Sequence, residues 1–390
     1  MVSPLKHRLH RFKTQITQII ILFSVLCSLF SVAYARSSQY IRVAVVQDAA
    51  SLNLKVLGPY EIIDSVEQKV LFRGNNLKTT VTTYKNEILL GKITSSTPKL
   101  LIKASESATI IINGRRFRGN IEQINKNNAR LLVINNIDLE DYIKGILYHE
   151  VSHYWPMEAL AAQAIVSRTY AVYQMKENKH RDYDVTCDIY SQVYGGRTSE
   201  RYRTNEAVKE TEGRILTYQD KAFPTYFHAT CGGHTEDASI LWDIDIPPLK
   251  GVACGFCKDS PHFNWHYVLS LDEIEGKLVN AGYNIGNIKD IVTQGKDKSA
   301  RFTDLKIASK QKDLKISTKD FRNIIGPNII RSTNFNVNVV EHDAVFEGFG
   351  WGHGVGLCQW GAYIMAKQGY TVEQILKYYY PQSDVKSIGF

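Results

Sequence analysis

The fold of this chain is organised around the stretch Leu139-Glu-Asp-Tyr-Ile-Lys-Gly-Ile-Leu-Tyr-His-Glu150-Val-Ser-His-Tyr-Trp155-Pro, followed by Met-Glu-Ala-Leu-Ala-Ala-Gln-Ala-Ile-Val-Ser-Arg-Thr-Tyr170. The pattern predicts a short helix over 139–147. Pro156 is suited to the first position of a long second helix. Acidic residues open the first helix, where we expect them to act in solvent as N-cap and helix-dipole partners: Asp138, Glu140 and Asp141.

Glu150 stands alone between these helices among apolar and aromatic residues. Its neighbours are Tyr148, Val151, Tyr154 and Trp155. Contact with such side chains would remove water from the charged carboxylate and raise its pKa toward neutrality, where it can donate a proton. The structural alternative is a half-buried carboxylate paired with Lys144 or Arg168.

A second block near the C-terminus is rich in glycine and reads Gly348-Phe-Gly-Trp-Gly-His353-Gly-Val-Gly-Leu-Cys358-Gln-Trp-Gly-Ala-Tyr-Ile-Met-Ala. The first block resembles the signature block of the SpoIID/LytB family, bacterial proteins that act on peptidoglycan glycan strands. The second resembles that family's closing motif. The resemblance spans roughly residues 41–380, and within it Glu150 aligns with the acid of the family's block.

The resemblance also implies a substrate-binding set in three segments. The long helix carries a polar stripe at Gln163, Ser167, Tyr170 and Gln174, which predicts a groove. Amide, guanidinium, phenol and imidazole groups in the three segments suit hydrogen bonds to sugars, and these candidates are Gln163, Arg168, Tyr170, Tyr190, Gln192, His353 and Gln359. Each candidate also has a structural alternative. The helix residues could serve packing or an internal ion pair, Tyr190 and Gln192 could belong to a plain turn, and His353 could support its loop. His149 and His153 lack a recognisable metal-ligand spacing and are left out of the site.

The implied function is cleavage of peptidoglycan glycan strands that lack stem peptides. A lytic transglycosylase can use one carboxyl group, which protonates the leaving oxygen and then takes a proton from the substrate's 6-hydroxyl, giving a 1,6-anhydro sugar. The runner-up is a glycan-binding enhancer of a cell-wall amidase that does not itself cleave. A zinc-dependent amidase is a weaker third reading. The expected partners are glycan strands and another wall hydrolase such as an amidase.

The cysteines form a second constellation. Cys231-Gly-Gly-His234 and Cys254-Gly-Phe-Cys257 are two pairs with the spacing of structural zinc sites, and His228 could replace His234. Export to an oxidising compartment would instead favour a disulfide, between Cys254 and Cys257 or from Cys231 to either. Zinc is favoured, in a closed structural site. The two remaining cysteines of the mature chain are expected to be small core residues: Cys187 and Cys358.

The N-terminal segment, residues 1–35, has the pattern of a signal peptide. Four basic residues precede an apolar run over 19–32, and Ala33-Tyr-Ala35 fits a cleavage site. We therefore expect export to the periplasm or the cell-wall side of the membrane. The alternative is that the segment stays uncleaved as an anchor, which would be the only contact of the chain with the membrane. Without this segment the formal net charge falls from +8 to +4. A mildly basic chain with one dense basic group, at 115–118, gives no reason to expect nucleic-acid binding.

The rest of the chain predicts an α+β fold. Residues 36–132 alternate β-prone runs with turns, including a hairpin at Asn113-Gly114, and form a β-rich N-terminal lobe. Residues 133–390 form the core with the glycine-rich loop, and they include a Cys/His insertion at 228–262. Helices are predicted over 271–278, 320–325, 359–368 and 372–380, and a strand over 303–307.

Overall fold

The computed structural model describes residues 39–95, 97–126, 129–188 and 191–388. The predicted signal peptide and Tyr190 lie outside the described residues. Among the helices of the described part, none is long and apolar enough to cross a membrane.

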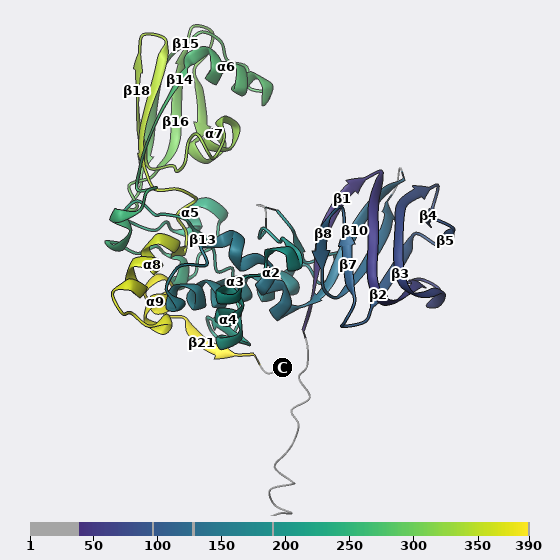
Figure 1. Cartoon of the computed structure of the whole chain (residues 1–390). Coiled ribbons are helices and arrows are strands. Elements are labelled where there is room, and N and C mark those ends of the chain that lie inside the picture. Colours follow the sequence, from purple (N-terminus) through teal and green to yellow (C-terminus); the bar gives the residue numbers. More distant parts are fainter. Residues whose placement is uncertain (1–38, 96, 127–128, 189–190, 389–390) are drawn as a thin grey trace, which may run out of the picture. The chain divides into compact units, whose positions relative to one another are not determined.

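The N-terminal part is built on one large, mostly antiparallel sheet (Figure 1). Its strands run in the spatial order β11-β1-β10-β9-β6-β2-β3-β4-β5, with a β7–β8 hairpin attached to β2. Asn113 and Gly114 both have positive φ at the tip of that hairpin, so the predicted turn is confirmed. The strands are β1 (Tyr40–Ala49), β2 (Ser51–Asp64), β3 (Lys69–Tyr84), β4 (Glu87–Leu90), β5 (Ile93–Ser95), β6 (Lys99–Ala104), β7 (Thr109–Ile112), β8 (Arg115–Phe117), β9 (Asn120–Lys126), β10 (Arg130–Asp138) and β11 (Val185–Thr186).

Two helices follow the sheet and share its hydrophobic core. β10 leads directly into α2 (Leu139–Glu150), which Asp138 caps by accepting from the amides of the next residues. The helix ends at Glu150, three residues later than predicted. α3 (Met157–Glu177) begins after Pro156, which occupies the N-cap position.

The expectation for Glu140 was wrong. Its side chain is 4% exposed and forms two hydrogen bonds to the guanidinium of Arg168, at 2.6 and 2.7 Å. The amide of Gly213 also donates to it. An acidic residue at a helix start resembles a cap in sequence, but here it is the buried half of an ion pair that ties α2 to α3.

A second hydrophobic core lies on another side of α3 and includes the last two helices. The two-stranded sheets β12–β21 and β13–β20 bring C-terminal strands onto the middle of the chain. The elements here are a short 3-10 helix (Gly196–Ser199), α4 (Tyr202–Glu210), β12 (Arg214–Thr217), β13 (Phe227–His228), α5 (Ala238–Trp242), two further 3-10 turns (Pro247–Leu249 and Phe256–Asp259), β20 (Leu357–Cys358), α8 (Gln359–Lys367), α9 (Val372–Tyr379) and β21 (Asp384–Ser387).

Residues 264–349 form a third part with its own hydrophobic core, which we call the inserted lobe. Its strands make two three-stranded sheets, β14-β19-β18 and β15-β16-β17. The sequence predicted several of its elements but not that they would enclose a separate core. They are β14 (Asn264–Ser270), α6 (Leu271–Asn280), β15 (Ile288–Lys296), β16 (Phe302–Ser309), β17 (Leu314–Ser317), α7 (Thr318–Ile325), β18 (Phe335–Val340) and β19 (Asp343–Phe349).

Helices and strands thus occur in separate groups, and the predicted α+β class is confirmed.

Candidate functional site

A cavity of about 340 Å³ lies at the C-terminal end of α2. Four of the predicted site residues line it: Glu150, Tyr170, Gln192 and His353. They come from α2, α3, the segment after β11 and the glycine-rich loop. The remaining lining residues are Ser191, Val193, Tyr226, Phe227 and Trp242.

Glu150 contributes a carboxyl group to the cavity wall, and the pKa of this group is raised. Removal of water raises its pKa from an ordinary value near 4.5 to about 7, although a hydrogen bond from the amide of Val193 acts in the opposite direction. The carboxylate also sits at the negative end of the α2 dipole, which disfavours its charge further. The carboxyl group can therefore hold a proton near neutral pH and still face a cavity large enough for part of a ligand.

The predicted rise in pKa is confirmed, but its predicted source is only partly right. Val151 is buried, whereas Tyr154 is 80% exposed and cannot shield the carboxyl. Most of the apolar wall comes instead from Tyr226, Phe227 and Trp242, which lie far along the chain. The predicted alternative of an ion pair is also wrong, because Arg168 pairs with Glu140 and Lys144 with Asp141.

A chain of amides fixes the backbone of Glu150. The Gln359 Nε2 donates to the Glu150 carbonyl oxygen at 3.2 Å and to Gln163 Oε1 at 3.3 Å. Gln163 Nε2 in turn donates to Ser167 Oγ at 3.2 Å. Both glutamines are buried and do not line the cavity. They hold the acid in place from behind, in contrast to the direct sugar contact predicted for them.

Tyr170 and Gln192 form a neighbouring wall of the cavity. Gln192 is locked by Tyr142, whose hydroxyl donates to its Oε1 at 3.1 Å. Burial raises the pKa of Tyr170, so its phenol stays protonated and can donate a hydrogen bond at neutral pH. The predicted groove along α3 reaches the cavity only at Tyr170, because Gln163 and Ser167 are enclosed in the core.

His353 faces Glu150's cavity as a neutral ring. Burial, together with the charges of Arg322 and Arg301, lowers its pKa to about 3. Its Nδ1 accepts a hydrogen bond from the Val355 amide at 3.1 Å, so the ring proton is on Nε2, and the ring donates to the Phe227 carbonyl. The ring also lies 5.0 Å from that of Trp242. His353 therefore shapes the wall and does not act as a second proton donor.

Arg168 lies outside this site. Its guanidinium is completely buried, pairs with Glu140, and donates to the backbone oxygens of Val208 and Arg214. Four of its five N–H groups bond within the chain, and the side chain is not exposed to the cavity, so the structure does not support direct contact with a sugar and favours the alternative of an internal ion pair. The missed wall residues carried no motif of their own in the sequence: Tyr226, Phe227 and Trp242.

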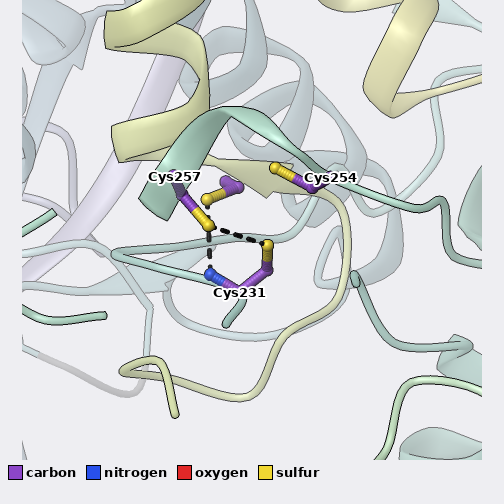
Figure 2. A group of neighbouring side chains, drawn as sticks. Cys231, Cys254 and Cys257 are labelled. Atoms are coloured by element: carbon purple, nitrogen blue, oxygen red, sulfur yellow. Dashed lines mark hydrogen bonds between the residues drawn. The ribbon is translucent and has the colours of Figure 1, made fainter. Parts of the chain in front are cut away.

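The second constellation is a buried group of four cysteines. The sulfurs of Cys231, Cys254, Cys257 and Cys358 all lie within 4.8 Å of one another. Figure 2 shows the sulfurs of Cys231, Cys254 and Cys257 turned toward one another, with 3.4 Å between those of Cys231 and Cys257. Four sulfurs around one tetrahedral zinc ion, each about 2.3 Å from it, would stand roughly 3.8 Å apart. The set therefore fits a zinc ion with four thiolate ligands.

Three of the predicted ligands, Cys231, Cys254 and Cys257, lie in this group, whereas the fourth, His234, does not. His234 points its Nδ1 at the Thr235 carbonyl, 2.6 Å away, and is not part of the group. Cys358, expected to be a plain core residue, takes the fourth place, and the amide of Cys231 donates to its sulfur at 3.3 Å. The described cysteines form no disulfide. Cys187 stays apart from the group and packs against the first core.

One short ladder joins the cavity to the cysteines. Phe227 of β13 pairs with Leu357 of β20, and His228 pairs with Cys358. Phe227 lines the cavity, whereas Cys358 belongs to the cysteine group, and Gln359 follows directly in α8. The glycines of the loop permit this close approach: a Cβ on Gly356 would stand 2.0 Å from the Tyr226 carbonyl oxygen.

Two family models match separate parts of the chain. Residues 127–218 match the family model described as stage II sporulation protein. This range contains Glu150, Tyr170 and Gln192 of the cavity wall. Residues 253–356 match a domain of unknown function, DUF8618, and this range contains Cys254, Cys257, the inserted lobe and the glycine-rich loop as far as Gly356.

Three relatives illustrate the range of similarity. An uncharacterized protein of Brachyspira hyodysenteriae is 33% identical over 355 residues, covering 90% of this chain and 94% of the relative. Stage II sporulation protein D of Bacillus amyloliquefaciens is 32% identical over 268 residues, covering 65% and 75%. The amidase enhancer of Bacillus subtilis is 26% identical over 295 residues, covering 63% of this chain and 40% of that protein.

The chain is thus an α+β protein with an enclosed acid beside a four-cysteine group. It belongs to the SpoIID/LytB family.

Proposed function

We propose that this protein is a peptidoglycan lytic transglycosylase that cleaves glycan strands lacking stem peptides. Family membership supports a function at the cell wall. The observation that carries the enzymatic proposal is the carboxyl group of Glu150, whose pKa of about 7 lets it hold a proton at the wall of a cavity. Among the described lining residues it is the sole carboxylic acid. A hydrolase would need a second one.

The chemistry follows from one group acting twice. Protonated Glu150 gives its proton to the oxygen that leaves the muramoyl C1 as the glycosidic bond breaks. The resulting carboxylate takes the proton of the same sugar's 6-hydroxyl while that oxygen bonds to C1. The products are a 1,6-anhydro muramoyl end and a free 4-hydroxyl, and the enzyme regains its proton without water. Tyr170 and Gln192 offer hydrogen bonds to the bound sugar.

The decisive comparison is between two glutamate-to-glutamine variants. Glu150→Gln should release anhydro-muramoyl products from stem-peptide-free strands at a rate about 1,000-fold lower than the parent chain. Glu177→Gln, which changes an exposed residue at the end of α3, should cleave normally. Mass spectrometry of the soluble products measures both. Equal product release by the Glu150 variant would refute the mechanism.

The second candidate is a glycan-binding enhancer of a wall amidase, favoured by the similarity to the amidase enhancer. In that case the same cavity would bind strands and leave them intact, and the chain would raise the rate of a purified amidase. Parent protein that retains glycan in a pull-down but yields no new ends would establish this function and exclude the transglycosylase.

We also propose a structural zinc ion at Cys231, Cys254, Cys257 and Cys358. Four buried thiolates would fill a tetrahedral coordination sphere and leave no position for an activated water, so the ion would hold the loop to α8 without entering the reaction. Elemental analysis of purified protein should give about one zinc per chain. A disulfide seen by mass spectrometry under non-reducing conditions, together with absent metal, would show the alternative instead.

Export is part of the same proposal, since the substrate lies outside the cytoplasm. Fractionation should recover a chain that begins at Arg36, consistent with cleavage after Ala35. A full-length chain in the membrane fraction would point to an anchor.

A further inference from the structure

Three arginines of the inserted lobe converge on the loop that carries His353. Arg301 is fully buried and donates to the carbonyl oxygens of Cys231 and His234. Arg331 places its guanidinium 4.8 Å above the Trp351 ring. Arg322, on α7, approaches the loop beside Gly352. Arg301 uses both terminal nitrogens within the chain and Arg331 stacks on an aromatic ring, whereas Arg322 has neither arrangement among the described residues.

Arg322 is held next to the cavity wall through one shared oxygen. Its Nε donates to the Arg331 carbonyl at 3.3 Å, and the amide of Gly352 donates to the same oxygen at 2.9 Å. The guanidinium is therefore adjacent to the residue that precedes His353, and its charge contributes to the lowered pKa of that ring. Only Nε is used in these bonds, which leaves the two terminal nitrogens to donate elsewhere.

No carboxylate of the described residues forms an ion pair with Arg322. Its side chain is half-buried, and both burial and the nearby Arg301 lower its pKa, to about 10. The residue stays charged at neutral pH in a place where its charge is costly. A guanidinium so placed, with its fork of donors unused, is suited to binding an anion from outside the chain.

A second cation extends the same edge. Lys319 lies three residues before Arg322, on the same face of α7. Its Nζ donates to the Leu241 carbonyl at 2.9 Å and lies 6.0 Å from the centre of the Trp242 ring. Trp242 and His353 are both wall residues of the cavity. Neither cation lines the cavity itself, but each is adjacent to one of its wall residues, so both lie at the same edge of the site that contains Glu150.

We propose that Arg322, assisted by Lys319, binds a carboxylate of the glycan, namely the free lactyl carboxylate that a muramoyl residue carries when its stem peptide has been removed. This inference rests on the proposed function, because it names what the inserted lobe recognises in the substrate of the same cavity. A lactyl group still joined to a peptide is an amide without charge, so it would lose this interaction. The inserted lobe thereby selects strands that have already lost their peptides.

The test compares glycans that differ in this carboxylate alone. The full chain carrying Glu150→Gln, which prevents cleavage, is titrated by calorimetry with peptide-free strands, with the same strands after conversion of their carboxyl groups to methylamides, and with chitin oligosaccharides. We expect the acid form to bind roughly tenfold more tightly than the methylamide. Adding Arg322→Gln should abolish that difference and leave the methylamide affinity unchanged.

Two further variants complete the design. Lys310→Gln removes an exposed charge from the same lobe, at the end of β16, and should keep the full preference. Arg322→Lys retains charge without the planar fork and should keep part of it. If Arg322→Gln binds no glycan at all, the lysine variant decides: a retained preference supports the proposal and a lost one overturns it.

The outcomes separate this inference from the function on which it rests. Equal affinity for acid and methylamide strands in the Glu150→Gln chain, or a preference that survives Arg322→Gln, would overturn the role of Arg322 alone. Failure to bind any of the three glycans would instead count against the proposed function.

Discussion

The Glu150 cavity and the four-cysteine group lie on the same short ladder but treat their reactive atoms in opposite ways. Glu150 is deprived of water yet remains at the wall of an open space, so its proton can be passed to a ligand. The cysteine sulfurs are fully enclosed and face one another. Partial enclosure tunes a group for reaction, whereas complete enclosure suits a group that only holds the chain together.

Replacement of one cysteine of the four-cysteine group should give the largest effect, a loss of stability. Cys358→Ser should remove zinc and lower the free energy of unfolding by at least about 4 kcal/mol, because a structural metal contributes directly to folding. His234→Ala should retain zinc and full stability, since His234 bonds to a backbone carbonyl outside the group. Metal content and urea unfolding measure both. If His234→Ala lost zinc and Cys358→Ser kept it, His234 and not Cys358 would be the fourth ligand.

The rate of cleavage at the Glu150 cavity should depend on pH more strongly than on bound zinc. Cleavage needs protonated Glu150, whose pKa is about 7, so the rate should fall about fivefold from pH 7 to pH 8 and about tenfold over the next unit, roughly fiftyfold in all between pH 7 and pH 9. His353, with a pKa of about 3, does not titrate in this range, and burial raises the pKa of Tyr170. A pH–rate profile of product release checks this. A rate that stays flat to pH 9 would show that no such acid is used.

The same pKa predicts a smaller effect on stability. The folded value, about 7, exceeds the unfolded value near 4.5, so the folded chain binds this proton more tightly. Ionisation costs nothing below about pH 4.5, and the cost grows until pH 7 and then stays constant. Glu150→Gln should therefore raise the free energy of unfolding by on the order of 3 kcal/mol at pH 9 relative to its effect at pH 4. Urea titrations at the two pH values measure the difference, which must vanish if Glu150 is solvated.

The smallest effect concerns the amide chain behind the acid. Gln163→Leu keeps the volume but removes the acceptor of Gln359, whose remaining partner is the Glu150 carbonyl. We expect roughly fivefold slower cleavage from a less well held acid, with normal zinc content. Steady-state rates and metal analysis on one preparation provide the readout. An unchanged rate would mean that the glutamines only fill the core.

The sequence predicted what local context and motif can encode. The α+β class and the Asn113-Gly114 hairpin both follow from residues that are near one another in sequence. The direction of the pKa shift of Glu150 was also predicted from its neighbours, although most of its apolar wall comes from distant residues. Two of the predicted cysteine ligands, Cys254 and Cys257, stand three positions apart, and the structure places both in the cysteine group. These features did not require knowledge of how distant segments meet.

The errors arose where distant segments meet. Cys358 lies 127 residues after Cys231 and outside any ligand spacing, so only the β13–β20 ladder brings it to the group. Glu140 and Arg168 are 28 residues apart, and their pairing depends on how α2 packs against α3. For the same reason, the sequence does not predict that Tyr226 and Trp242 line the cavity. Tyr190 remains a prediction, since it lies outside the described residues.

If the chain is exported and binds zinc as proposed above, the closeness of Cys231 and Cys257 bears on the order of events during its maturation. Two thiols whose sulfurs stand 3.4 Å apart are also well placed to be oxidised to each other once they reach an oxidant. If the ion arrives first, its bonds protect the sulfurs; if oxidation comes first, the fourth cysteine on β20 loses its partners and the ladder to the cavity loosens. In the proposed exported chain, metal binding and thiol oxidation would then compete for the same sulfurs.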